Sequence, residues 1–111
     1  MNEETTKKWL AMCIDRKDWD KAEIAAMELS NPGKTQAMDD LCRVYVEQGL
    51  LFKAIKIKKI LGSQSLSDAE LETIWRANIE AHDYVTSREA LKLLPTAKQT
   101  ALEATILQHH R

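Results

Sequence analysis

The sequence is poor in the residues that build β-sheets and tight turns. Its 111 residues include three glycines, two prolines and 5% aromatic residues, and these scarcities argue against a β-rich fold. No apolar run approaches the roughly 20 residues that cross a bilayer as a helix, so we expect no membrane partner. The formal net charge is −1, a balance that provides no general attraction for nucleic acid.

Motifs that carry catalysis or hold a cofactor are also missing. The chain has no glycine-rich phosphate loop, no nucleophile elbow, no His-Glu-x-x-His and no Cys-x-x-Cys, each of which places reactive groups in a defined geometry. Asp39 and Asp40 are adjacent, so on a helix they point about 100° apart and form no carboxylate dyad. His109 and His110 also point to different sides of a helix, which favours a solvated tail over a metal site. We expect no enzymatic activity, no cofactor and no bound metal.

The two cysteines bear on the redox environment. Cys13 and Cys42 occupy apolar positions of predicted helices. The opening segment MNEETTKKW carries acids, and the apolar stretch of a secretory signal does not follow it. We therefore expect both thiols to be buried and reduced in a cytoplasmic protein.

Residues 37–61 contain the clearest pattern of the chain. Apolar residues recur at i, i+3, i+4 and i+7 in the first half of this stretch, as Met38, Leu41, Cys42 and Tyr45. After Gly49 a second apolar stripe follows, made of Leu51, Ala54, Ile57 and Leu61. This spacing predicts two amphipathic helices joined by a glycine turn. Such a hairpin cannot cover its own apolar face, so it needs neighbours.

The same frame recurs on both sides of this hairpin. A shift toward the N-terminus that places Trp9 on Leu41 superposes Trp9, Leu10, Cys13, Trp19, Ala22, Ala25 and Leu29 on the central pattern. A shift in the other direction that places Ile74 on Leu41 superposes Ile74, Trp75, Asn78, Tyr84, Ser87, Ala90 and Leu94. An internal repeat therefore predicts three helical hairpins, with Trp9, Trp19 and Trp75 facing inward. Ala22 and Ala54 are expected where two helices approach closely.

The residues of these units resemble the tetratricopeptide repeat, which reads W-x2-L-G-x2-Y…A-x3-F…P over about 34 residues. The central unit offers Met38-x2-Leu41-Cys42-x2-Tyr45, then Gly49 and Ala54. The first unit contributes the turn Lys17-Asp18-Trp19-Asp20-Lys21-Ala22. The chain departs from the pattern at Cys42, at Trp75 and at Lys58, and the central unit has no terminal proline. The resemblance covers about residues 5–95, and another αα-hairpin repeat is the alternative.

This resemblance implies an all-α, right-handed αα-hairpin repeat stack of about three hairpins plus a C-terminal capping helix. The whole chain, 1–111, would form a single domain. Its parts are units at about 2–33, 34–66 and 67–95 and a capping helix at 96–109. Capping-box spacings at Ser67…Glu70 and at Thr96…Gln99 predict the starts of the fifth and last helices, and Asp18 is expected to cap the second. A lone last helix would cover the apolar end of the array, with an interaction segment as the second choice.

In the resembled family, the first helices of successive units line a groove that binds a partner. The positions that correspond in this chain are Lys7, Ala11, Ile14, Asp15, Asp39, Arg43, Val46, Glu47, Glu72, Arg76, Ile79 and Glu80. In each unit an aliphatic residue (Ile14, Val46 or Ile79) is expected to face the surface beside an acid. The acids and arginines also stand at i, i+4 spacings, as in Asp39–Arg43–Glu47 and Glu72–Arg76–Glu80, which stabilise a helix whatever the protein binds.

The resulting hypothesis is a non-enzymatic protein–protein interaction module, adaptor or chaperone-like, that binds a peptide or amphipathic helix in this groove. Arg43 and Arg76 would choose partners that bear carboxylates. Self-assembly into a homo-oligomer is the alternative, and RNA binding by the helical repeat is a lesser one. A basic stretch with Lys53, Lys56, Lys58 and Lys59 is interpreted as the solvated outer side of the fourth helix. The alternative is a surface for an acidic partner, a membrane or nucleic acid.

Overall fold

The computed structural model describes residues 2–62 and 65–109, and within them every regular element is an α-helix. The helices are α1 (Glu3–Asp15), α2 (Trp19–Glu28), α3 (Gly33–Glu47), α4 (Leu51–Ile60), α5 (Asp68–Glu80), α6 (Tyr84–Lys92) and α7 (Thr96–His109). The all-α prediction is therefore confirmed. The expected solvated tail at His110 lies outside the described residues.

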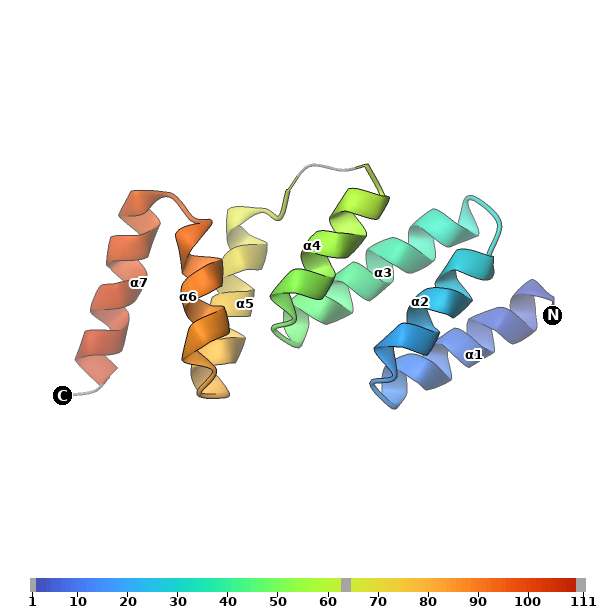
Figure 1. Cartoon of the computed structure of the whole chain (residues 1–111), viewed down its shortest axis with the longest axis horizontal. Helices are drawn as coiled ribbons and strands as arrows, with labels where there is room; N and C mark the ends of the chain where they lie inside the picture. The colour runs from blue at the N-terminus through green and yellow to red at the C-terminus, as the bar shows by residue number, and fades with distance from the viewer. Residues whose placement is uncertain (1, 63–64, 110–111) are drawn as a thin grey trace.

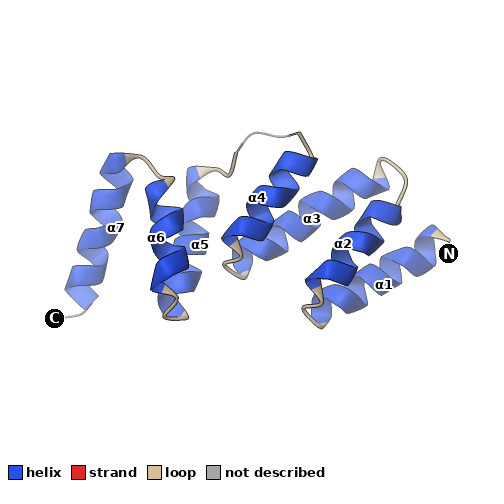
Figure 2. Ribbon diagram, in the orientation of Figure 1, coloured by secondary structure: helices blue, strands red, loops and turns tan. Residues whose placement is uncertain are grey.

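The helices are arranged in two layers along an elongated chain. α1 packs against α2, α3 against α4 and α5 against α6, and α2 and α3 also pack against each other. Figure 1 shows α1, α3 and α5 in one layer, which we call the first-helix layer, behind α2, α4 and α6, the second-helix layer. α7 follows at the end of the row, and short loops join the helices (Figure 2). The Cα atoms extend over 54 × 27 × 16 Å.

Each pair of helices is joined by the same turn. Lys17, Gly49 and His82 have φ values of 58°, 74° and 61°. The next residue in each turn donates its amide hydrogen to a carbonyl five residues back, at 2.8 Å in all three cases. These are the features of the Schellman motif, which ends a helix in the left-handed conformation. The three turns occupy equivalent positions of the frame that the sequence pattern indicates.

Alanines and large apolar residues share the core. Ala22, Ala25, Ala26, Ala54 and Ala90 have no exposed surface, and the largest fully buried side chains are Tyr45, Met38, Leu41, Leu51, Ile57 and Ile74. Cys13 and Cys42 are buried free thiols, as expected. Trp75 is buried as predicted, whereas Trp9 and Trp19 are only half-buried at the edge of the core.

The helix starts follow the sequence in one case and depart from it in two. At α5 the predicted capping box is confirmed, because Glu70 donates its amide to Ser67 Oγ and Ser67 donates its amide to the Glu70 carboxylate. Asp18 precedes α2, but its side chain caps nothing and instead faces Lys21 at 3.7 Å. At α7 the predicted box is wrong: Thr96 is already helical, and the Gln99 side chain donates to the Leu94 carbonyl.

α7 is held to the rest of the molecule by a few apolar residues. Leu102 is buried in the core and Ile106 packs against it. Most of its other described side chains are exposed. None of the described helices combines the length and the apolar character needed to cross a membrane.

Candidate functional site

The predicted partner-binding residues all lie in the first-helix layer. Most of them are exposed to solvent, namely Lys7, Ala11, Asp15, Asp39, Arg43, Glu47, Arg76 and Glu80. Ile14, Glu72 and Ile79 are half-buried. The charged members of the set therefore reach solvent, and the aliphatic members lie lower between the helices.

Val46 corrects the expected aliphatic row. Its side chain is 6% exposed and belongs to the core, so it is not surface-facing. The reason is the close approach of α3 to α5. Near that approach Asn78 Nδ2 donates to the Gly49 carbonyl at 2.9 Å, and a Cβ at position 49 would lie 3.0 Å from Ala77 Cβ. A neighbouring hairpin therefore covers the middle of the predicted row.

The structure brings the predicted residues together in three hollows along this layer. Lys7, Ala11 and Ile14 line a cavity of about 260 Å³ with Leu10, Gln36 and Asp40. Asp39 and Arg43 line a polar cavity of about 320 Å³ with Gln36, Cys42, Lys58 and Glu70. Arg76, Ile79 and Glu80 line a cavity of about 380 Å³ with Trp75, Tyr84 and Ile106. Asp15, Val46, Glu47 and Glu72 line none of these three.

The third cavity, which we call the α5–α7 hollow, combines an apolar floor with a charged rim. Ile79 of α5 and Ile106 of α7 contribute aliphatic surface. The Arg76 guanidinium donates to the Glu72 carboxylate at 2.7 Å and lies 5.9 Å from the centre of the Trp75 ring. The Glu72–Arg76 pair is thus confirmed. A guanidinium fixed between a carboxylate and an indole is well placed to receive a second carboxylate.

The other arginine pairs differently from the prediction. Arg43 lies 3.5 Å from Asp40 rather than forming the expected pair with Asp39. Residues at i, i+3 and at i, i+4 lie on the same face of a helix, so both acids are within reach of one guanidinium. Among the described residues, neither arginine bridges to the glutamate that follows it four positions later. The charges of the first-helix layer are therefore only partly neutralised by one another.

The second-helix layer carries apolar surface that the sequence analysis missed. Of the eight exposed large apolar side chains in the described part of the chain, only Met12 lies in the first-helix layer. The other seven are Ile24, Met27, Phe52, Ile60, Tyr84, Val85 and Leu93. The repeat frame itself held a signal, since Phe52 and Val85 occupy equivalent positions of successive units, as do Ile60 and Leu93.

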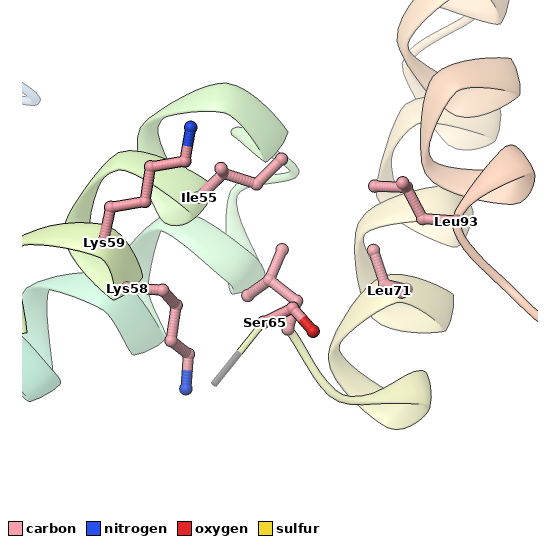
Figure 3. A pocket seen from close by; sticks show the side chains of 7 residues that line it. Ile55, Lys58, Lys59, Ser65, Leu71 and Leu93 are labelled. Carbon is pink, nitrogen blue, oxygen red and sulfur yellow. The ribbon is translucent and has the colours of Figure 1, made fainter. Parts of the chain in front are cut away.

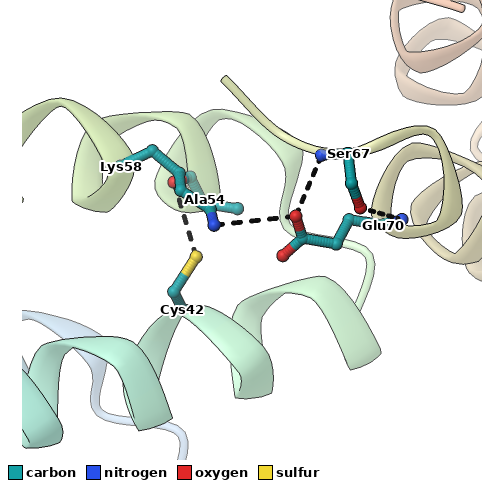
Figure 4. A network of polar contacts seen from close by, with 5 residues as sticks. All are labelled: Cys42, Ala54, Lys58, Ser67 and Glu70. Atoms are coloured by element: carbon teal, nitrogen blue, oxygen red, sulfur yellow. Dashed lines mark hydrogen bonds and ion pairs between the residues drawn. The ribbon is translucent and has the colours of Figure 1, made fainter. Parts of the chain in front are cut away.

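The lysines of α4 also depart from the solvated face that we expected. Lys56 pairs with Glu23 of α2, and Lys58 lies 3.6 Å from Glu70 of α5. Figure 4 shows Lys58 beside the Ser67–Glu70 capping box, so one carboxylate serves both the cap and the ion pair. α4 therefore uses two of its four lysines to hold neighbouring hairpins.

Two further observations concern the metal-binding and nucleophilic side chains of the described residues. Within them no group of three His, Cys, Asp or Glu side chains is arranged to hold a metal ion. Burial raises the pKa of the Cys42 thiol, which keeps it protonated and poorly nucleophilic at neutral pH. Cys42 instead donates a weak hydrogen bond to the Ala54 carbonyl at 3.8 Å.

No family model, no curated protein and no solved structure matches this chain. The likeness to tetratricopeptide repeats therefore rests on the residues quoted above.

Proposed function

We propose that this chain is a non-enzymatic protein-interaction module, adaptor or chaperone-like, built as a right-handed tetratricopeptide-like stack of three αα-hairpins closed by α7. The recurrence of one Schellman turn at Lys17, Gly49 and His82 supports the three-unit frame. The burial of Leu102 supports the role of α7 as an end cap.

The α5–α7 hollow is the observation that carries the proposed function. It is the place where a predicted arginine, Arg76, a predicted aliphatic residue, Ile79, and a predicted acid, Glu80, line one cavity. Ile79 and Ile106 offer apolar surface to one large side chain of a partner. Arg76 stands at the rim, where a partner carboxylate would share it with Glu72.

The apolar residues and the arginine would contribute differently to the free energy of binding. Burying a leucine-sized side chain contributes about 1.5–3 kcal/mol, so the apolar floor supplies most of the affinity. An exposed ion pair contributes less than about 1 kcal/mol. The arginine therefore selects the register and the charge of the partner rather than the strength of binding.

Affinity capture from a lysate of the source cell tests this proposal. The wild-type protein is compared with Arg76→Glu, which places a like charge beside Glu72, and with Arg88→Glu on the second-helix layer as the matched control. Both arginines are exposed, so both variants should fold. We expect one protein to be retained by the wild type and the control and lost by Arg76→Glu. Retention by all three would move the binding face away from the α5–α7 hollow.

Self-assembly is a second candidate, and the exposed apolar side chains of the second-helix layer favour it. It predicts a molecular mass that rises with protein concentration. Sedimentation velocity of the wild-type chain across a wide concentration range measures this directly.

A further inference from the structure

A second apolar cavity lies between α4 and the α5/α6 pair. Its volume is about 340 Å³, and we call it the α4–α6 hollow. Ile55 extends from α4 on one side, and Leu71 and Leu93 face it from the other (Figure 3). Leu93, at the end of α6, is 55% exposed. One wall of the hollow is thus an apolar side chain that the fold leaves in solvent.

The two junctions between successive helix pairs are packed differently. α2 packs directly against α3, whereas α4 does not pack closely on α5. Met38 and Leu71, which are equivalent in the frame, are both buried, at 1% and 3% exposed, so the difference lies in how the helices pack rather than in these two side chains. The segment that joins α4 to α5 is also longer than the one that joins α2 to α3. Looser packing of α4 on α5 therefore accompanies the hollow.

The rim of the α4–α6 hollow is basic. Lys58 and Lys59 of α4 both line it, and α4 contains four lysines and no acidic residue. Lys58 is shared with Glu70, but Lys59 makes no ion pair with any described residue and is exposed. An apolar floor beside an uncompensated cation is complementary to an apolar side chain beside a carboxylate.

We propose that the α4–α6 hollow binds an acidic amphipathic helix of another protein. One large apolar side chain of that helix enters between Ile55, Leu71 and Leu93, and a carboxylate one turn away pairs with Lys59. This surface lies between α4, α5 and the end of α6 and shares no lining residue with the α5–α7 hollow, so it stands or falls independently of the proposed function.

A designed peptide tests the proposal. The probe is a fluorescein-labelled helical peptide with leucines at i, i+3, i+4 and i+7 and glutamates at most other positions, and its binding is followed by fluorescence anisotropy. A second peptide with lysine in place of every glutamate measures the part played by charge. We expect saturable binding of the acidic peptide to the wild-type protein, which weakens as salt is raised, and at least tenfold weaker binding of the basic peptide.

Two variants and two matched controls locate the site. Leu93→Ser removes the exposed apolar wall and should weaken binding of the acidic peptide roughly tenfold. Lys59→Glu should weaken it several-fold at low salt. Val85→Ser, on α6 but 76% exposed and outside the hollow, and Lys8→Glu on α1 should leave binding unchanged. All four side chains are exposed, so circular dichroism melts should match those of the wild type.

Wild-type protein alone provides a further check, because methyl NMR shifts should move at Leu71 and Leu93 when the acidic peptide is added. Equal binding of the two peptides, or unchanged binding by Leu93→Ser, would overturn the proposal. So would shifts confined to the α5–α7 hollow. A concentration-dependent mass that Leu93→Ser abolishes would show that a second copy of this chain covers the hollow instead.

Discussion

Two junctions connect successive helix pairs: α2 meets α3 at the first, and α3 meets α5 at the second. Equivalent positions of the frame hold different residues at the two junctions. At the first, Tyr45 of α3 donates its hydroxyl to Glu23 of α2 at 2.6 Å and meets the Trp19 ring edge-on at 5.3 Å. At the second, the equivalent residue is Asn78, whose amide donates to the Gly49 carbonyl. One junction is filled by an aromatic ring, and the other is held by a short polar side chain.

The two junctions also differ in their packing. The tyrosine ring fills the space between α2 and α3 and has no exposed area itself. At the second junction α5 packs on α3, where Asn78 bonds the Gly49 carbonyl, and α4 does not pack closely on α5. Different residues at one position of the frame thus accompany different packing at the two junctions.

The largest expected effect comes from emptying the first junction. Tyr45→Ala removes a fully buried ring and should lower the free energy of unfolding by about 3–5 kcal/mol, as large-to-small changes in a core do. Urea denaturation followed by circular dichroism measures it. A loss below about 1 kcal/mol would mean that this ring does not support the junction.

A backbone change breaks the second junction. Gly49→Ala places a Cβ on a residue with φ of 74°, 3.0 Å from Ala77 Cβ and from Asn78 Nδ2. We expect a loss of about 2–4 kcal/mol, from the left-handed conformation and from overpacking together. Gly62→Ala is the control, because Gly62 has φ of 66° with nothing within 4 Å, and it should cost only about 1–2 kcal/mol. Equal losses for the two variants would contradict the close approach of α5.

Alkaline pH tests the first junction without changing its packing. Burial, and then the hydrogen bond to Glu23, raise the pKa of Tyr45 above its usual value. The folded protein therefore keeps this proton above pH about 10, where the unfolded chain releases it. Below that pH the Tyr45 proton does not affect the pH dependence of stability. Above it, the free energy of unfolding falls by up to about 1.4 kcal/mol per pH unit.

Thermal melts between pH 9 and pH 11 measure this dependence. Tyr45→Phe should flatten the alkaline fall, and Tyr84→Phe, at an exposed tyrosine, should leave it as in the wild type. If the wild type and Tyr45→Phe lose stability in parallel, the hydroxyl of Tyr45 is not held in its protonated form by the fold.

The smallest expected losses of stability come from removing one ion pair at each junction. Lys56→Gln removes the partner of Glu23, whose side chain is 15% exposed, and Lys58→Gln removes a partner of Glu70, which is 29% exposed. Both losses should lie below about 1 kcal/mol, with Lys56→Gln the larger because Lys56 lies closer to its partner than Lys58 does. Lys8→Gln on α1 serves as the control. A reversed order of the two losses would show that the separation of the charges does not decide their strength.

The local structure was largely predictable from spacing. The apolar periodicity of 37–61 indicated α3 and α4, and the Ser67…Glu70 spacing predicted the cap of α5. Lys17 and His82 are equivalent to Gly49 in the frame and adopt the same left-handed turn, although neither is a glycine. These features depend on residues within one or two helical turns of each other, and their geometry is set by the backbone.

The candidate site was less predictable. Val46 was expected at the surface and is buried, and the lysines of α4 were expected in solvent although two of them bridge to other hairpins. Arg76, Ile79 and Glu80 do line one cavity, but Trp75, Tyr84 and Ile106 complete it from three helices. Spacing within a helix cannot say which neighbour covers which part of its face.

By itself the sequence determined where the helices run, where most of them turn, and which side of each is apolar. Only the tertiary structure decided how far apart successive hairpins stand. That distance depends on the volume of side chains contributed by different units, such as Tyr45 at one junction and Asn78 at the next. Because packed interiors leave little empty space, one large or small residue at such a junction sets whether a surface closes or remains open.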